Sequence, residues 1–384
     1  MKCTIGSSVL SCAKSAGKAA ARKAEDGVES AKLALVYSSV AYDMDLLLAG
    51  VKEALPGVPV IGNTSFTGVI TPEGYITGDE GFVGVMLLSG EDFYVGVKGL
   101  PKEGSARDTG KMAALAAAEA NGSPDYFYMA APPGEEEFFL KGISDVIGRK
   151  PLFGGSAADN TISGEWKVYT DEGAFADGVA VAFFYGGEPA VNLFTGAYRE
   201  TDDVGIITKV RDNRVLEEID GVPAVKKYAE WRGVDPDTIM GGNLLVATIT
   251  SPLGIKDRLG DLTAIRHPMN GNDDYSMNIG ANLAEKTAVI RMESTVDELI
   301  ASASETLKAL KEKMTAEPAG FLLVHCGGRR AGIGDRLNEV AEAVKAEAGD
   351  VPFMMQFTFG EYGYEDDGNN STGGLMLSYT GFTK

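Results

Sequence analysis

The segment PVIGNT at residues 59–64 has a counterpart, PLFGGS, at residues 151–156, an offset of 92 positions. Two more glycines, Gly50 and Gly142, keep the same offset. Few residues are identical, but apolar, turn and glycine positions coincide without a gap. Such repetition at a fixed period predicts a duplicated α/β unit. Because α/β folds bind ligands beyond the carboxyl ends of their strands, we expect these two strand ends to hold one ligand between them.

Each copy predicts the same order of elements: helix, strand, helix, strand, loop and a closing hairpin. Leu47, Val51 and Ala54 lie on one face at helical spacing, and Asp43 stands where it would cap that helix. The predicted elements of the two copies are helices at 17–21 and 110–114, strands at 35–38 and 127–130, helices at 43–55 and 135–147, and hairpins at 83–97 and 179–194.

The C-terminal part predicts a third, weaker version of the unit. Thr295 and Glu298 have the spacing of a capping box before an amphipathic helix. The elements expected after it are a strand at 321–325, a helix at 333–344, a strand at 352–359, a loop at 360–370 and a strand at 374–379. Between the units we expect a hairpin around Asp212, a helix at 223–231, a strand at 244–249, a loop at 267–279 and a domain boundary near Glu217.

The amino-acid composition excludes some classes of function. The chain has 384 residues, 44% hydrophobic and 23% charged, as in ordinary soluble proteins, and a net charge of −20. A strongly acidic protein is a poor match for nucleic acid or an anionic membrane surface. No apolar run approaches the roughly 18 residues that span a bilayer, so we expect no membrane insertion. Three scattered cysteines, Cys3, Cys12 and Cys326, suggest no disulfide framework and favour a cytoplasmic location.

Several segments in order resemble the FIST family. They are Val60-Ile61-Gly62 at a strand end, Ile219-Asp220-Gly221-Val222-Pro223-Ala224, the turn Cys326-Gly327-Gly328-Arg329, and Phe359-Gly360-Glu361 before Asn370-Ser371-Thr372. No single motif is specific, but their order and spacing cover nearly the whole chain. The resemblance implies a lead-in at 1–30, a FIST N-like domain at 31–217 with internal repeats at about 17–100 and 110–196, and a FIST C-like domain at 218–384.

The resemblance also implies a role. FIST domains are regarded as ligand-sensing modules of signal transduction, with small ligands such as amino acids proposed for them. Within these 384 residues no output domain is recognised, so the resemblance implies that this chain reports to a separate kinase, cyclase or chemoreceptor. The fold class expected is α/β with mixed sheets, duplicated units in the N-terminal domain and a related unit in the C-terminal domain.

Two charged residues are the main candidates for ligand contacts. Glu361, after Gly360 at a strand end, would accept hydrogen bonds from an amine. Arg329 stands in a glycine-rich turn that opens a helix, where a guanidinium and free N–H groups favour a carboxylate. Together they suit an amino-acid-like ligand. The alternatives are a solvated loop carboxylate and glycines that serve only a tight turn.

Further polar groups are expected at the equivalent strand ends, where they either bind the ligand or satisfy the turns. These candidates are Gly62, Asn63, Thr64, Gly154, Gly155, Ser156, Asn370 and Thr372.

Other functions stay open. Cys326 would serve a hydrolase or transferase as nucleophile, but neighbouring strand residues face opposite sides, so His325 cannot form a dyad with it. A buried structural thiol is the favoured interpretation. Haem is an alternative cofactor that would need an axial ligand such as His267 or His325; otherwise no cofactor is expected. The cysteines and histidines lack zinc-site spacing, and no metal is expected. A scaffold that binds only proteins is the third alternative.

Overall fold

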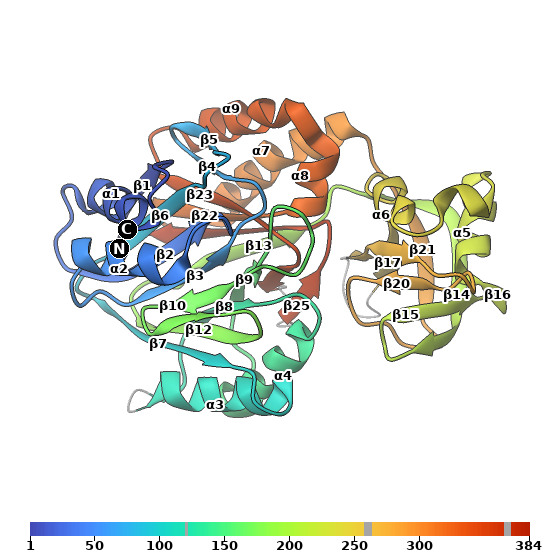
Figure 1. Ribbon diagram of the computed structural model, residues 1–384, viewed down its shortest axis with the longest axis horizontal. Coiled ribbons are helices and arrows are strands. Elements are labelled where there is room, and N and C mark those ends of the chain that lie inside the picture. Colours follow the sequence, from blue (N-terminus) through green and yellow to red (C-terminus); the bar gives the residue numbers. More distant parts are fainter. Residues whose placement is uncertain (120–121, 257–262, 365–369) are drawn as a thin grey trace.

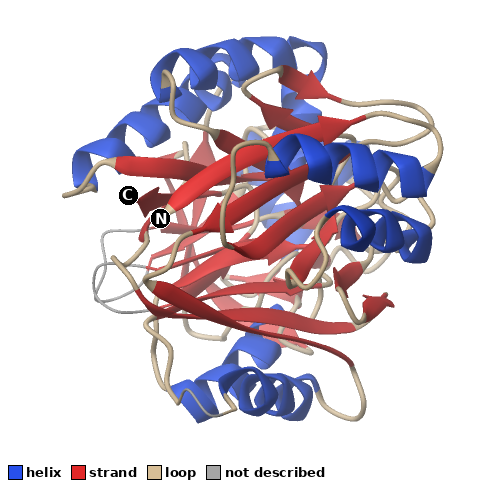
Figure 2. Cartoon of the chain, turned by 90° about the vertical axis from the view of Figure 1, so that its left-hand side faces the viewer, coloured by secondary structure: helices blue, strands red, loops and turns tan. Residues whose placement is uncertain are grey.

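The computed structural model describes residues 1–384 apart from 120–121, 257–262 and 365–369. It consists of a large body and a smaller lobe (Figure 1). The body contains three six-stranded sheets, and the lobe is built from residues 199–293 around one further sheet. Figure 2 shows helices lying along the outside of the stacked strands of the body. This mixed α/β architecture agrees with the predicted fold class.

Three units of similar order make up the body. The first contains β1 (Lys2–Ser8), α1 (Ala13–Glu25), β2 (Ala31–Ser38), α2 (Met44–Ala54), β3 (Val60–Thr64), β4 (Val69–Thr71), β5 (Gly74–Ile76) and β6 (Val83–Ser89). The second contains β7 (Phe93–Pro101), α3 (Ala106–Ala118), β8 (Tyr126–Ala131), α4 (Glu136–Ile147), β9 (Leu152–Ser156), β10 (Val168–Thr170), β11 (Gly173–Phe175) and β12 (Gly178–Gly186).

The third unit begins with β13 (Val191–Thr195), and the lobe is then inserted before the unit resumes. The resumed part contains α7 (Val296–Lys313), β22 (Pro318–Cys326), α8 (Gly327–Ile333), α9 (Leu337–Ala348), β23 (Phe353–Thr358), β24 (Glu361–Tyr364), β25 (Asn370–Gly373) and β26 (Leu377–Thr383). The lobe contains β14 (Arg199–Arg211), β15 (Val215–Ile219), β16 (Val222–Pro223), α5 (Ala224–Arg232), α6 (Asn243–Ala247), β17 (Leu253–Lys256), β18 (Thr263–Arg266), β19 (Pro268–Gly271), β20 (Met277–Ile279) and β21 (Ala288–Glu293).

Each unit gives its inner hairpin to the sheet of another unit. Strands β10 and β11 of the second unit extend the first sheet beside β3, and β24 and β25 of the third extend the second sheet beside β9. Strands β4 and β5 of the first unit complete the cycle beside β23 of the third. The three sheets therefore form a closed, three-part ring. One apolar cluster with members from all three sheets, including Leu35, Phe153 and Leu322, fills its interior.

The repeated glycines are explained by close packing. In the pair α1–α2, a Cβ on Gly50 would lie 2.0 Å from the carbonyl oxygen of Lys14. In the pair α3–α4, a Cβ on Gly142 would lie 1.9 Å from the carbonyl oxygen of Arg107. Only glycine allows the two helices of each pair to approach this closely.

The strand-end glycines are explained by close contacts with neighbouring strands. Tyr169 of β10 is the register partner of Gly62, and Tyr362 of β24 is the register partner of Gly154. A Cβ on Gly62 would lie 1.7 Å from the Val36 carbonyl oxygen of β2 and 2.9 Å from the ring of Tyr169. A Cβ on Gly154 would lie 2.0 Å from the Met129 carbonyl oxygen of β8. The glycines that reveal the repeat in the sequence are therefore explained here by packing between and within units.

Several local predictions are wrong. The segments 83–97 and 179–194 are not hairpins: β6 pairs with β1 and β2, β7 pairs with β12, and β13 pairs with β26. Each tight turn instead passes the chain from one sheet to the next. The predicted strand at 244–249 is largely the short helix α6, and the predicted loop at 267–279 contains β19 and β20. The predicted hairpin around Asp212 is confirmed by the pairing of β14 with β15.

The spatial units of the chain have other bounds than the two predicted domains. The lead-in at 1–30 contains the strand β1, which pairs with β6, as well as helix α1. Glu217 lies inside β15, and β15 pairs with β14 across the predicted boundary. The lobe is thus an insertion in the third unit, and it contains the strands on both sides of the predicted boundary.

Candidate functional site

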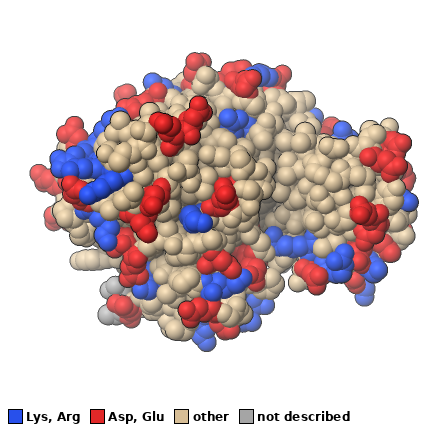
Figure 3. All heavy atoms as spheres, in the orientation of Figure 1, with Lys and Arg blue, Asp and Glu red and all other residues tan. Residues whose placement is uncertain are grey.

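The candidate site lies where strands of the third sheet end beneath the inserted lobe. Strand β22 ends at Cys326, β23 ends at Thr358, and β24 begins at Glu361. This is the carboxyl side of the parallel pair β22–β23, the side on which α/β folds present ligands. Figure 3 shows a groove on the surface where the lobe meets the body.

Glu361 is fully buried and well supported. Its carboxylate accepts hydrogen bonds from the Thr358 hydroxyl at 2.8 Å and from the Met376 backbone N–H at 2.9 Å. Burial raises the pKa of Glu361 to about 8, although these hydrogen bonds and the positive charge of Arg329 act in the opposite direction. The side chain therefore carries a proton for most of the time near neutral pH.

Arg329 is a buried guanidinium in α8. Its Nη2 atom donates to the Ser302 hydroxyl at 2.5 Å and to the Leu299 carbonyl at 3.2 Å. Its Nε atom has no hydrogen-bond partner among the residues that the structure describes. Within the described ranges of the chain, no carboxylate lies in ion-pair contact with Arg329. A buried cation without an anionic partner is costly, which marks this position for an anion.

Cys326 is held as a neutral thiol. Its sulfur accepts hydrogen bonds from the backbone N–H groups of Gly328 at 3.3 Å and Leu375 at 3.1 Å. Burial raises the pKa of Cys326 far above the usual range, and the nearby Glu361 adds to the effect. Because the thiolate is the nucleophile, this environment disfavours the hydrolase or transferase alternative.

The lobe contributes an imidazole that the sequence could not place. His267 lies with its Cε1 atom 3.4 Å, and the Cys326 sulfur 3.5 Å, from the point where a Cβ on Gly328 would stand. Its Nε2 atom is 3.2 Å from the Leu245 carbonyl, and burial lowers the pKa of His267 to about 4. The imidazole is therefore neutral and does not form an ion pair with Cys326.

A cluster of polar side chains formed by Ser156, Tyr362 and Glu136 lies beside Glu361. The hydroxyls of Ser156 and Tyr362 are 2.7 Å apart, and Ser156 also donates to Glu136 at 3.3 Å. Glu136 is only 3% exposed and receives Arg214 of the lobe at 2.8 Å. Because Tyr362 follows Glu361 in β24, this chain of contacts joins the site to the edge of the lobe.

The other predicted strand-end residues are satisfied by the protein itself. The Asn63 amide donates to the Gln356 side chain at 2.9 Å and accepts from the Tyr128 hydroxyl at 3.0 Å. The Thr64 hydroxyl and the Lys167 carbonyl are 3.3 Å apart, and all of these side chains are buried. The tips of the first two units do come together, but around packed side chains.

The remaining candidates fall into two groups. Gly154 and Gly155 lie in buried strand β9, opposite Tyr362 and Glu361 respectively, and a Cβ on Gly360 would lie 2.7 Å from the Ser156 hydroxyl. Thr372 pairs with Tyr362, whereas the Asn370 amide turns to the Lys150 carbonyl at 3.0 Å. Gly360 and Ser156 thus border the site, and Asn370 faces elsewhere.

No group of three or more His, Cys, Asp or Glu residues in the described part of the chain is arranged to hold a metal ion. His325 is fully buried in β22 with its Nδ1 3.0 Å from the Cys326 carbonyl, and burial lowers its pKa to about 3. Its Nε2 has no hydrogen-bond partner in the described part of the chain, but the ring packs against Phe357, as a core residue does.

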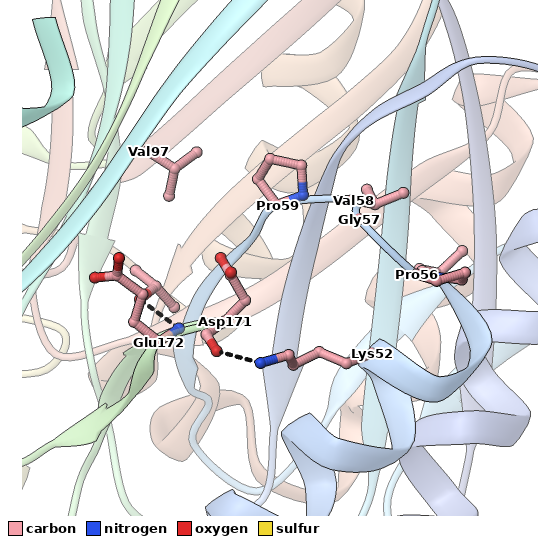
Figure 4. A pocket seen from close by; sticks show the side chains of 10 residues that line it. Lys52, Pro56, Gly57, Val58, Pro59, Val97, Asp171 and Glu172 are labelled. Carbon is pink, nitrogen blue, oxygen red and sulfur yellow. Dashed lines mark hydrogen bonds between the residues drawn. The ribbon is translucent and has the colours of Figure 1, made fainter. Parts of the chain in front are cut away.

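A surface pocket of about 490 Å³ lies elsewhere, between the loop before β3 and the β10–β11 turn (Figure 4). Lys52 donates to the Asp171 carbonyl at 2.9 Å, and the Asp171 carboxylate accepts from the Val60 N–H at 3.2 Å. This pocket is at the amino end of β3, opposite the strand tips, and its polar groups already bind one another.

Comparison with known families decides the identity of the chain. The FIST N domain model matches residues 32–222, and the FIST C domain model matches residues 224–364. The chain belongs to the FIST family. FIST domains are sensor domains of signal transduction that are thought to bind small ligands. Sequence reasoning therefore identified the family, while the spatial insertion within it required the structure.

Comparisons with solved structures and with curated proteins do not extend this identification. One solved structure, phosphoribosylformylglycinamidine synthase II from Thermotoga maritima, matches at 11% identity, covering 99% of this chain and 71% of that chain. Its TM-score of 0.22 is too low for any argument about fold or function. No curated protein matches. In the described residues, every helix is too short or too polar to traverse a lipid bilayer.

Proposed function

We propose that this FIST protein is a cytoplasmic sensor that binds a small polar ligand, such as an amino acid, between the third sheet and the inserted lobe. The observation that carries the proposal is Arg329: a fully buried guanidinium with a free Nε atom and no carboxylate partner among the described residues. A ligand carboxylate would supply the missing charge through paired hydrogen bonds.

In this proposal Glu361 contacts the amine of the ligand. A ligand ammonium beside it would favour the carboxylate form and lower the pKa of Glu361 from about 8. At pH 7 binding would then release a proton. The measured binding enthalpy would differ between phosphate and Tris buffers in proportion to their ionisation enthalpies. A ligand that binds at Arg329 with no buffer dependence would show that Glu361 does not contact an amine.

The first test is native mass spectrometry of freshly purified protein. We expect a co-purifying small molecule that carries a carboxylate, and we expect it to be lost from Arg329→Gln. The matched control is Arg336→Gln, because Arg336 is exposed and pairs with Asp297 and Glu339 on the surface. A ligand retained equally by wild type and both variants would place the site elsewhere.

The response would then pass to a separate protein. We propose a kinase, cyclase or chemoreceptor as that partner, because the family matches extend over residues 32–222 and 224–364 and both are FIST domains. Pull-down with and without the identified ligand tests this. Equal recovery of partners in both conditions would speak against a sensory role.

A further inference from the structure

The inserted lobe joins the body through two short, adjacent connections. Strand β14 starts at Arg199, soon after β13 ends at Thr195, and β21 ends at Glu293, just before Thr295 caps α7. Arg199 and Glu293 are register partners, so the two connections lie side by side. A domain tethered in this way can rotate about a few residues without disturbing either sheet.

The lobe covers the candidate site. Ile265, Ile290 and Met292 of the lobe form one apolar cluster with body residues that include Cys326 and Met376. His267 of the lobe lies against Gly328 and Gly374. Because Arg329, Glu361 and Cys326 are all buried, a ligand from solution reaches them only when this cover moves.

A charged contact holds the lobe at its far edge. Arg214, in the β14–β15 turn, donates to Glu136 at 2.8 Å and to Glu137 at 2.5 Å at the start of α4. The Asn282 N–H donates to the other Glu137 oxygen at 3.0 Å. Arg214 is itself fixed within the lobe, because it also donates to the Gly280 carbonyl at 3.0 Å.

The contact of Arg214 with Glu136 and Glu137 stabilises the closed arrangement relative to an open one. In the closed form Glu136 is 3% exposed, and burial raises its pKa while Arg214 opposes that effect. Removing Arg214 would leave a buried carboxylate without its cation, which is strongly unfavourable. In an open form water would solvate Glu136, so the same change would cost little there.

We propose that residues 199–293 form a hinged cover over the Arg329–Glu361 site, and that Arg214 latches it to Glu136 and Glu137. The contacts from Glu136 through Ser156 to Tyr362, beside Glu361, give the latch a physical link to the site. The role of the cover, to admit and retain a ligand, rests on the proposed function. The motion of the cover does not depend on a ligand.

The three cysteines provide the experiment. Cys12 is exposed, Cys3 is buried in the first sheet, and Cys326 is buried under the lobe. Pulse labelling of the full chain with a thiol reagent, read by peptide mass spectrometry, follows all three at once. Cys12 reports reagent activity, Cys3 reports global unfolding, and Cys326 reports opening of the cover. We expect Arg214→Ala to label Cys326 at least about tenfold faster than wild type, the factor that corresponds to about 1.4 kcal/mol.

The matched control is Arg211→Ala, which removes an exposed arginine at the end of β14 that pairs with Glu217 inside the lobe. It should leave Cys326 labelling unchanged. Glu137→Gln keeps Glu136 in place and should give a smaller increase, which tests the latch if Arg214→Ala fails to fold. Labelling of Cys326 that is unchanged in the folded latch variants, or that rises only in step with Cys3, would overturn the proposal. A ligand panel without binding would remove the proposed function and leave this result standing.

Discussion

Two buried ionisable residues, Arg329 and Glu361, dominate the site at the scale of single residues. Arg329 and Glu361 stand at strand ends in glycine-containing turns, and both were predicted from the sequence for that reason. Arg214 was not predicted as a site residue, and His267 was considered only as a haem ligand, because both come from the inserted lobe. The lobe is inserted between β13 and α7, and these two elements belong to the body. Nothing in the sequence of the lobe indicates that this insertion places it against β22. The burial of Glu361 could not be predicted either, because its neighbours in the sequence form an acidic run that is typical of a solvated loop.

Glu361 should make stability depend on pH. Burial raises its pKa from 4.5 to about 8 in the folded state, so the folded protein retains a proton that the unfolded chain loses. The stabilising contribution is present below pH 4.5 and is lost as the pH rises toward 8. Glu361→Gln imitates the protonated form and avoids this loss. Its free energy of unfolding relative to wild type should rise by up to about 1.4 kcal/mol per pH unit across that window.

Urea unfolding at several pH values measures this difference. The control is Glu312→Gln, which changes an exposed glutamate on α7. A difference between Glu361→Gln and wild type that stays constant from pH 5 to pH 8 would mean that Glu361 is ionised in the folded protein.

Paired helices and exchanged hairpins are the features that matter at the scale of elements. The helix pairs and the repeat itself were predictable, because glycines and apolar positions recur at a fixed offset. The exchange of hairpins was not, because β4, β10 and β24 pair with strands of other units, far away in sequence. A local pattern shows that a strand forms but not which distant edge it joins.

The helix-pair glycines provide a prediction. Gly142→Ala would place a Cβ within 1.9 Å of the Arg107 carbonyl oxygen, so α3 and α4 must move apart. We expect a loss of about 1–3 kcal/mol in the free energy of unfolding, although alanine favours helix more than glycine does. Thermal and urea unfolding check this.

Gly242→Ala is the matched control, because a Cβ there meets no heavy atom within 4 Å. It should change stability by less than about 0.5 kcal/mol. Equal stability of Gly142→Ala and wild type would show that the two helices are not in the close contact described.

The whole molecule is a ring of three units with a lobe inserted in the third. All three sheets of the body are complete without the lobe, because among the described residues β14 to β21 pair only with one another. The sequence predicted three units and the family but placed the domain boundary at Glu217, inside the lobe. The third unit was hard to recognise in full, since its first strand lies at 191–195 and its next element begins at 296.

Removal of the lobe tests this organisation. Arg199 and Glu293 are register partners, so a short Gly-Ser linker can replace residues 200–292. We expect the remaining body to unfold cooperatively and Cys326 to react with thiol reagents nearly as fast as Cys12. The unmodified chain is the control. A truncated chain that is folded but still protects Cys326 would show that the lobe does not cover the site.

In the proposed function, Arg329 receives the carboxylate of a small ligand beneath the lobe. Calorimetric titration of wild type, Arg329→Gln and Arg336→Gln with a panel of amino acids tests it most directly. We predict that at least one amino acid binds wild type and Arg336→Gln equally and binds Arg329→Gln at least about a hundredfold more weakly, as expected for the loss of a buried charge partner. No heat from any amino acid, or equal affinity for all three proteins, would contradict the account.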